Sequence, residues 1–257
     1  MQIETAGLLL GAGLLGGVVT ALVGGASLIT FPALLAAGLP PVLANASNTV
    51  ALTPANFAAI VADRRLLPRP DRTLIGIVAV SVAASVAGAL LLLATPEKAF
   101  TTLVPMLIGL ATLLFAFADR IRAAATRRRR AGAAARSNLA MHLAPFVPLG
   151  LYGGYFGAGM SVVLLAILSI ARPGEFRTVN ALKNLLSGVT SGTAVVVFLL
   201  QGAVAWPETL ALMAGGLLGG YGGGHLARIL PRDWVRAIVI LAGTVLTIVY
   251  AWRYWAG

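Results

Sequence analysis

The chain has 257 residues, of which 59% are hydrophobic and only 11% are charged, and its formal net charge is +11. The core of a soluble domain cannot bury that much apolar surface, so the composition excludes an ordinary soluble protein and indicates an integral membrane protein. The basic residues lie between apolar runs, which favours cytoplasmic loops over a nucleic-acid partner. The chain has no cysteine, and its two histidines, His142 and His225, are far apart in sequence. No metal or cofactor is therefore expected.

Long apolar stretches recur from end to end and predict an all-α polytopic fold, because backbone groups in a bilayer must bond internally. The second and seventh stretches are too short to cross a hydrocarbon core about 30 Å thick. Whether they cross fully or re-enter is left open. The ten expected helices are residues 5–23, 25–38, 44–62, 73–95, 98–119, 139–156, 159–171, 177–201, 206–227 and 233–255.

Basic residues are concentrated in every second loop. Those loops carry 16 lysines and arginines, whereas the intervening loops and the termini carry only Lys98 and Arg253. The positive-inside rule therefore predicts that the basic loops are cytoplasmic and that both termini lie outside the inner (plasma) membrane. The four basic loops are residues 62–72, 119–138, 172–177 and 228–236.

The long basic loop divides the chain into a first repeat (1–120), a linker (121–138) and a second repeat (139–257). Each repeat has five predicted helices, and an odd number gives the two repeats opposite orientations, which is the layout of an inverted repeat. A shift of 135 residues aligns their polar positions. It places Asn45 on Asn180, Asn48 on Lys183, Thr49 on Asn184, Asn56 on Ser191 and Gly24 on Gly159.

These polar residues recur at i, i+3 and i+4, so each repeat should contain one helix with a polar face. Interhelical hydrogen bonding alone would explain Asn and Ser at such a face. A lysine within a membrane helix is costly and normally faces a polar cavity or a partner. All eight acidic residues lie near predicted helix ends or in loops, so an anionic ligand is a candidate partner for Lys183. The alternative is that Lys183, six residues from Arg177, reaches the cytoplasmic surface.

Glycines mark a second shared feature, where a long helix should end and a short one begin. Gly24 and Gly25 precede Ser27, and Gly157 and Gly159 precede Ser161. Glycine permits a tight turn there, and the new helix N-terminus presents N–H groups that favour anions. Ordinary glycine-mediated helix packing is the alternative.

Two stretches carry a resemblance to a known family. "GGVVTALVGGASLITFPALLAAGLPPVLANASNTVALTP" and "GGYFGAGMSVVLL…NALKNLLSG" are similar to the two signatures of the TauE/SafE family of sulfite and organosulfonate exporters. The likeness covers nearly the whole chain and implies an inverted-repeat transporter of small sulfur-containing or carboxylate anions. The first motif reads GGAS here, where many relatives have a richer glycine run.

We therefore expect a transporter, and not an enzyme, that exports sulfite or an organosulfonate bound between the repeats. An anion channel is one alternative, and an intramembrane serine hydrolase that uses Ser27 or Ser161 with His225 is another. The lipid bilayer and the small anion are the expected partners, and the oligomeric state is not indicated. The expected binding residues are Lys183, Asn45, Asn48, Thr49, Asn180, Asn184, Ser27, Ser161, Gly24, Gly25, Gly157 and Gly159.

Overall fold

The computed structural model describes residues 2–22, 25–130, 143–171, 175–226 and 232–256. Over these ranges the chain consists of helices and short connections, without strands, which confirms the all-α prediction. The helices are α1 (Ile3–Leu22), α2 (Ser27–Ala36), α3 (Pro41–Asp63), η1 (Arg64–Leu66), α4 (Arg72–Ala94), α5 (Glu97–Ala116), α6 (Ala118–Arg130), α8 (Phe146–Tyr155), α9 (Met160–Ala171), α10 (Phe176–Leu200), α11 (Trp206–Leu226), α12 (Arg232–Ala251) and η2 (Trp252–Ala256).

Each of the ten predicted helices overlaps an observed one, and α2 and α9 are short, with 10 and 12 residues. The predicted start of the sixth helix, residues 139–142, lies outside the described residues. Helix α3 begins at Pro41 instead of residue 44, because a proline at the first helical position has the required φ and needs no N–H partner.

The prediction of a loop over residues 119–138 was wrong for its first part, because α6 extends to Arg130. Alanine and arginine, which dominate α6, both have high helix propensity. The helix also packs against α9, and its Ala125 is buried. The positive-inside pattern reports the side of the membrane and carries no information about backbone conformation.

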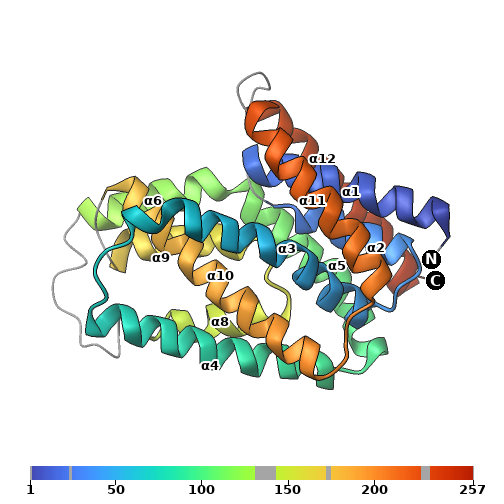
Figure 1. Cartoon of the computed structure of the whole chain (residues 1–257), viewed down its shortest axis with the longest axis horizontal. Coiled ribbons are helices and arrows are strands. Elements are labelled where there is room, and N and C mark those ends of the chain that lie inside the picture. Colours follow the sequence, from blue (N-terminus) through green and yellow to red (C-terminus); the bar gives the residue numbers. More distant parts are fainter. Residues whose placement is uncertain (1, 23–24, 131–142, 172–174, 227–231, 257) are drawn as a thin grey trace.

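Within the described residues, five helices are long and apolar enough to cross a membrane: Ile3–Thr20, Arg72–Ala94, Glu97–Ala116, Phe176–Leu200 and Trp234–Trp255. Large apolar side chains cover their outer faces; Leu200 is 80% exposed and Leu241 is 65% exposed. An exterior of this kind fits lipid and not water. The chain is therefore an integral membrane protein. Figure 1 shows both termini at the same end of the molecule.

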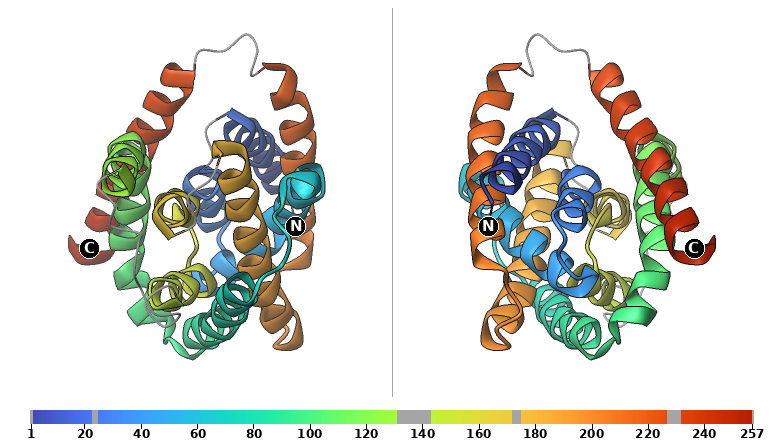
Figure 2. Two further views of the ribbon diagram at one scale, coloured as in Figure 1. Left: turned by 90° about the vertical axis from the view of Figure 1, so that its left-hand side faces the viewer. Right: turned by 90° about the vertical axis from the view of Figure 1, so that its right-hand side faces the viewer.

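Corresponding helices of the two halves begin at a nearly constant spacing. Helices α3 and α10 start 135 residues apart, α5 and α12 also 135 apart, and α4 and α11 134 apart. The packing repeats in the same way, because α1 packs on α11 and its counterpart α8 packs on α4. Each close pair thus contains one helix from each half. Figure 2 shows α11 and α12 on opposite flanks, with the shorter helices between them.

The α1–α11 and α4–α8 pairs approach closely through glycines. A Cβ at Gly215 or Gly219 of α11 would collide with carbonyl oxygens of α1, and one at Gly154 of α8 would collide with the Ser85 carbonyl of α4. Small residues permit such approach where lipid supplies no hydrophobic drive for helix association.

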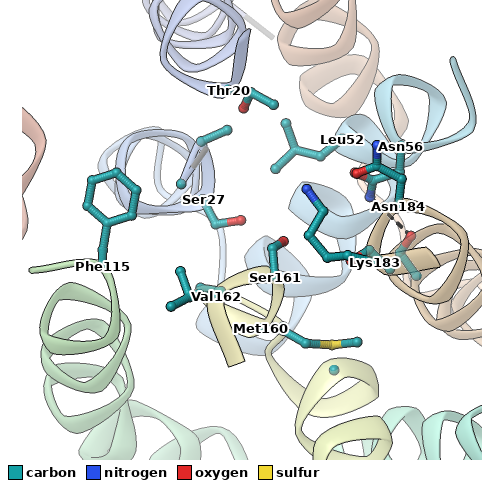
Figure 3. Close-up of a pocket in the computed structure, with 18 of the residues that line it drawn as sticks. Thr20, Ser27, Leu52, Asn56, Phe115, Met160, Ser161, Val162, Lys183 and Asn184 are labelled. Carbon is teal, nitrogen blue, oxygen red and sulfur yellow. Dashed lines mark hydrogen bonds between the residues drawn. The ribbon is translucent and has the colours of Figure 1, made fainter. Parts of the chain in front are cut away.

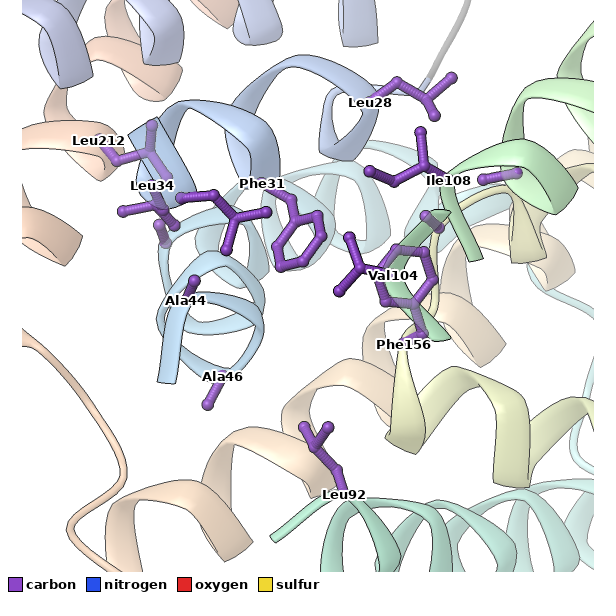
Figure 4. Packing of buried hydrophobic residues seen from close by; sticks show 14 of the residues in the cluster. Leu28, Phe31, Leu34, Ala44, Ala46, Leu92, Val104, Ile108, Phe156 and Leu212 are labelled. Atoms are coloured by element: carbon purple, nitrogen blue, oxygen red, sulfur yellow. The ribbon is translucent and has the colours of Figure 1, made fainter. Parts of the chain in front are cut away.

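Helices α3 and α10 pack against each other in the middle of the molecule. Asn56 Nδ2 donates to Ser191 Oγ over 3.1 Å, and these two residues correspond under the 135-residue shift. Two residues that correspond in sequence thus contact each other between the halves. The buried apolar cluster in Figure 4 joins α2, α3 and α5 to Phe156, whose ring meets Phe31 edge-on at 5.4 Å.

Candidate functional site

A cavity of about 720 Å³ lies among α2, α3, α10 and the turn between α8 and α9. Figure 3 shows Ser27, Ser161 and Lys183 pointing into it from three helices. Asn45 does not line it, and Gly24 lies outside the described residues. The predicted site residues that do line it are Gly25, Ser27, Asn48, Thr49, Gly157, Gly159, Ser161, Asn180, Lys183 and Asn184.

Glycines shape the two turns that bring α2 and α9 to the cavity. Gly25, Gly157 and Gly159 have φ values of 92°, 73° and 77°, a left-handed region that side chains with a Cβ disfavour. The amide of Gly157 donates to Tyr152 O at 2.9 Å and so closes the end of α8. The chain can therefore reverse locally and start a new helix at the cavity wall.

Lys183 is half-buried and, within the described residues, forms no ion pair and no hydrogen bond. The charges that act on it are the Arg122 guanidinium and the Asp63 carboxylate, which oppose each other. Asp63 already accepts a hydrogen bond of 2.6 Å from Asn184 Nδ2. The side chain of Lys183 points toward Ser27 and Ser161 (Figure 3). The ammonium group is thus available to a ligand.

Asn48 is held in place from the neighbouring short helix. The Thr30 hydroxyl donates to Asn48 Oδ1 at 2.6 Å, and both side chains are buried. With its oxygen satisfied, the amide of Asn48 has its N–H groups left for a ligand, since it lines the cavity.

The mouth of the cavity carries charged residues that the sequence reading missed. Arg122 and Arg236 line it together with Asp119, which pairs with Arg236 and lies 3.8 Å from Arg122. Arg236 also donates to Ala116 O at 2.9 Å, at the C-terminus of α5. With Lys183, these lining residues give the cavity an excess of positive charge, which attracts anions.

The opposite side of the cavity is closed. Asn45 Nδ2 donates to Tyr155 O at 2.8 Å, which ties α3 to the end of α8. Phe156 packs on Phe31, and Tyr155 packs on Phe100 at 5.7 Å. The cavity therefore includes residues beside the basic segments, such as Arg122 and Arg236, and does not include Asn45.

The hydrolase alternative needs a base beside Ser27 or Ser161. The side chain of His225 lies outside the part of the chain that the structure describes. Lys183 is the charged side chain labelled beside both serines in Figure 3, and Asp119, Arg122 and Arg236 also line the cavity.

An all-helical body, a lipid-facing exterior and a polar cavity are typical of membrane transporters. The chain belongs to the TauE/SafE family: the family described as Sulfite exporter TauE/SafE matches residues 9–250. The resemblance read from the two sequence signatures is thus confirmed.

Similar proteins span the chain almost completely. One is the probable membrane transporter protein YfcA of Escherichia coli strain K12, 25% identical over 244 residues that cover 94% of this chain and 87% of that protein. Another is a probable membrane transporter protein of Haemophilus influenzae, 26% identical over 252 residues that cover 95% and 94%. A third is the probable membrane transporter protein ORF9 of a Sinorhizobium species, 26% identical over 238 residues that cover 92% and 88%. No solved structure matches the chain.

Proposed function

We propose that the protein is a carrier for a small sulfur-containing anion, sulfite or an organosulfonate, which it exports across the inner membrane. The observation that carries this proposal is Lys183, a cation that faces a polar cavity without an ion-pair partner among the described residues. Asn48, Asn180 and the serines at the starts of α2 and α9 supply further donors. The Asn45–Tyr155 hydrogen bond ties α3 to the end of α8 beside the cavity, which supports a carrier over an open channel.

The two repeats supply a route to the opposite, outward-open state. Under the 135-residue shift, Asn45 and Tyr155 correspond to Asn180 and Thr20, and both of these counterparts line the open cavity. Tyr155 and Thr20 each lie in the last turn of a helix, where carbonyls lack a helical partner. In this outward-open state Asn180 donates to the Thr20 carbonyl and closes the inner side, and the hydrogen bond from Asn45 to Tyr155 is broken.

The orientation is testable because the chain has no native cysteine. We expect a membrane-impermeant maleimide to label a Lys98→Cys variant in intact cells and a Thr126→Cys variant only after the cells are opened. Both positions are exposed, and they lie at opposite ends of the predicted topology. Labelling of the Thr126→Cys variant from outside would show that the chain has the opposite orientation.

Transport itself is tested with the purified chain in proteoliposomes. We expect saturable flux of sulfite or of alkylsulfonates down their own gradients, and counterflow when unlabelled anion is placed on the far side. Most carboxylates of the described chain lie at helix ends, so a pH gradient alone should not drive a permanently ionised sulfonate uphill at clamped voltage. Flux that never saturates would favour the channel, and flux no greater than that of empty liposomes for every anion would refute the proposal.

A further inference from the structure

A groove of about 360 Å³ lies between α5, α8 and α9. It is separate from the polar cavity, because no residue lines both. Its walls include Leu110 and Leu114 of α5, Pro148 of α8 and Ile167 of α9. Leu110 is 44% exposed, and Val147, which precedes Pro148, is 49% exposed. The groove therefore opens on the outer surface of the protein, which faces lipid.

The walls of this groove are apolar. The polar side-chain atom among its lining residues is the hydroxyl of Tyr152, and that hydroxyl donates to Ala158 O at 2.6 Å. The lining side chains thus leave no hydrogen-bonding group for water or for an anion. An empty space of this kind forfeits dispersion contacts along its whole lining, so hydrocarbon is the chemistry that fits it.

The α5 wall of the groove leads to a cation. Leu110, Leu114 and Phe117 follow the spacing i, i+4 and i+7 of one helical face. The amide of Phe117 donates to Leu113 O at 2.9 Å, so helical hydrogen bonding continues beyond the end of α5. The Arg120 guanidinium lies over the ring of Phe117, 5.3 Å from its centroid. A cation–π contact therefore holds this arginine at the end of the apolar stripe.

Arg120 is available to a ligand. It is exposed and, within the described residues, forms no ion pair. Its neighbour Asp119 lines the polar cavity, which Arg120 does not, and pairs there with Arg236. Arg127 is also exposed and lies seven residues further along α6, on the same face as Arg120. Two exposed arginines beside a membrane helix attract the head groups of anionic lipids.

The spacing along the helix fits a lipid. Arg120 is six residues beyond Leu114, which is about 9 Å along the axis at 1.5 Å per residue. The head-group layer on each side of a bilayer is about 5–8 Å thick. When Leu114 lies at the edge of the hydrocarbon, Arg120 therefore lies at the depth of the lipid phosphates. Figure 1 shows α6 beside α9, so the cation and the groove are at the same end of the molecule.

We propose that the groove binds an anionic phospholipid. One acyl chain lies between α5, α8 and α9, the phosphate binds Arg120, and Arg127 adds attraction. The predicted topology places this lipid in the cytoplasmic leaflet, which carries anionic lipids. Helix α9 lines the groove with Val163 and the polar cavity with Val162. A bound chain thus supports the helix that forms one wall of the cavity, whichever anion the cavity takes.

The first test measures lipid binding to the purified, delipidated full chain by native mass spectrometry. The probes are phosphatidylglycerol, which carries a net negative charge, and phosphatidylcholine with the same acyl chains, which does not. Phosphatidylglycerol should bind at least about fivefold more tightly, and glycerol phosphate, which has no acyl chain, should not bind. Equal affinities of the two lipids, or no binding of phosphatidylglycerol, would overturn the proposal. A dimer that forms in place of lipid binding would assign the groove to a second copy of the chain.

The second test concerns the cation. Arg120→Gln should weaken phosphatidylglycerol binding by about fivefold and so reduce the preference for the anionic lipid, whereas Arg120→Lys keeps the charge and should retain that preference. The matched control is Arg253→Gln, because Arg253 is also exposed and lies over an aromatic ring, that of Tyr254, at 5.9 Å. Arg253 is near the other end of the predicted topology and should have no effect. Equal losses in Arg120→Gln and Arg253→Gln would refute a specific head-group site.

The third test concerns the groove. Leu110→Trp puts a larger side chain on the groove wall and should weaken both lipids. Leu113→Trp is the control, because Leu113 is 56% exposed on the same helix and does not line the groove. Both positions are exposed, so both variants should fold, and the melting temperature in detergent checks that they do. Native lipid affinity in folded Leu110→Trp would show that the chain does not occupy this groove.

Discussion

Replacing Lys183 with glutamine is expected to weaken sulfonate binding by about tenfold to a hundredfold while the protein still folds. A charge-assisted hydrogen bond in a desolvated site contributes about 1.5–3 kcal/mol, which corresponds to that loss. Folding should survive because, among the described residues, Lys183 forms no hydrogen bond or ion pair that the glutamine would break. Titration calorimetry gives the affinity, and the melting temperature in detergent gives the stability.

The chain provides a control, because its other lysine is exposed on the first turn of α5. Lys98→Gln removes the same formal charge from the protein and should leave affinity unchanged. Similar losses in both variants would indicate a general effect of net charge. Native affinity in Lys183→Gln would mean that the lysine reaches the cytoplasmic surface and does not contact the anion.

The second large effect is expected at the glycine contact between α1 and α11. A Cβ at Gly219 would collide with the Leu14 carbonyl, so Gly219→Ala forces two backbones apart. Overpacking of this kind costs about 1–3 kcal/mol, and the melting temperature in detergent should fall accordingly. The neighbouring Gly220→Ala is the control, because a Cβ there meets nothing within 4 Å and a helical alanine is favoured over glycine. Equal melting temperatures for the two variants would contradict close packing of this pair.

The helices and much of the cavity wall followed from the sequence because their signals are local. A long apolar stretch indicates a membrane-spanning helix. A shift of 135 residues shows which polar residues of the two repeats are equivalent. Lys183 stood out because a cation is rare in such a segment, and the structure places it in the cavity. The turn glycines were visible because few other residues adopt the φ they need.

Other features depend on packing that the sequence does not show. In the sequence, Arg122 and Arg236 indicate only which loops are cytoplasmic. It is the fold that brings them to the mouth of the cavity. Asn45 looked equivalent to Asn180, yet Asn45 bonds the Tyr155 carbonyl away from the cavity and Asn180 lines the cavity. The conformation therefore gives these two equivalent positions different surroundings.

The pairing of α1 with α11 and of α4 with α8 also has a consequence for biogenesis. Helix α1 is made well before α11, on which it packs. The glycine-lined surface of α1 must therefore wait without this partner until α11 has been made. Neither half can complete its packing alone, since each contains helices whose closest partners belong to the other half. Synthesis of α11 is thus the step that lets α1 complete its packing.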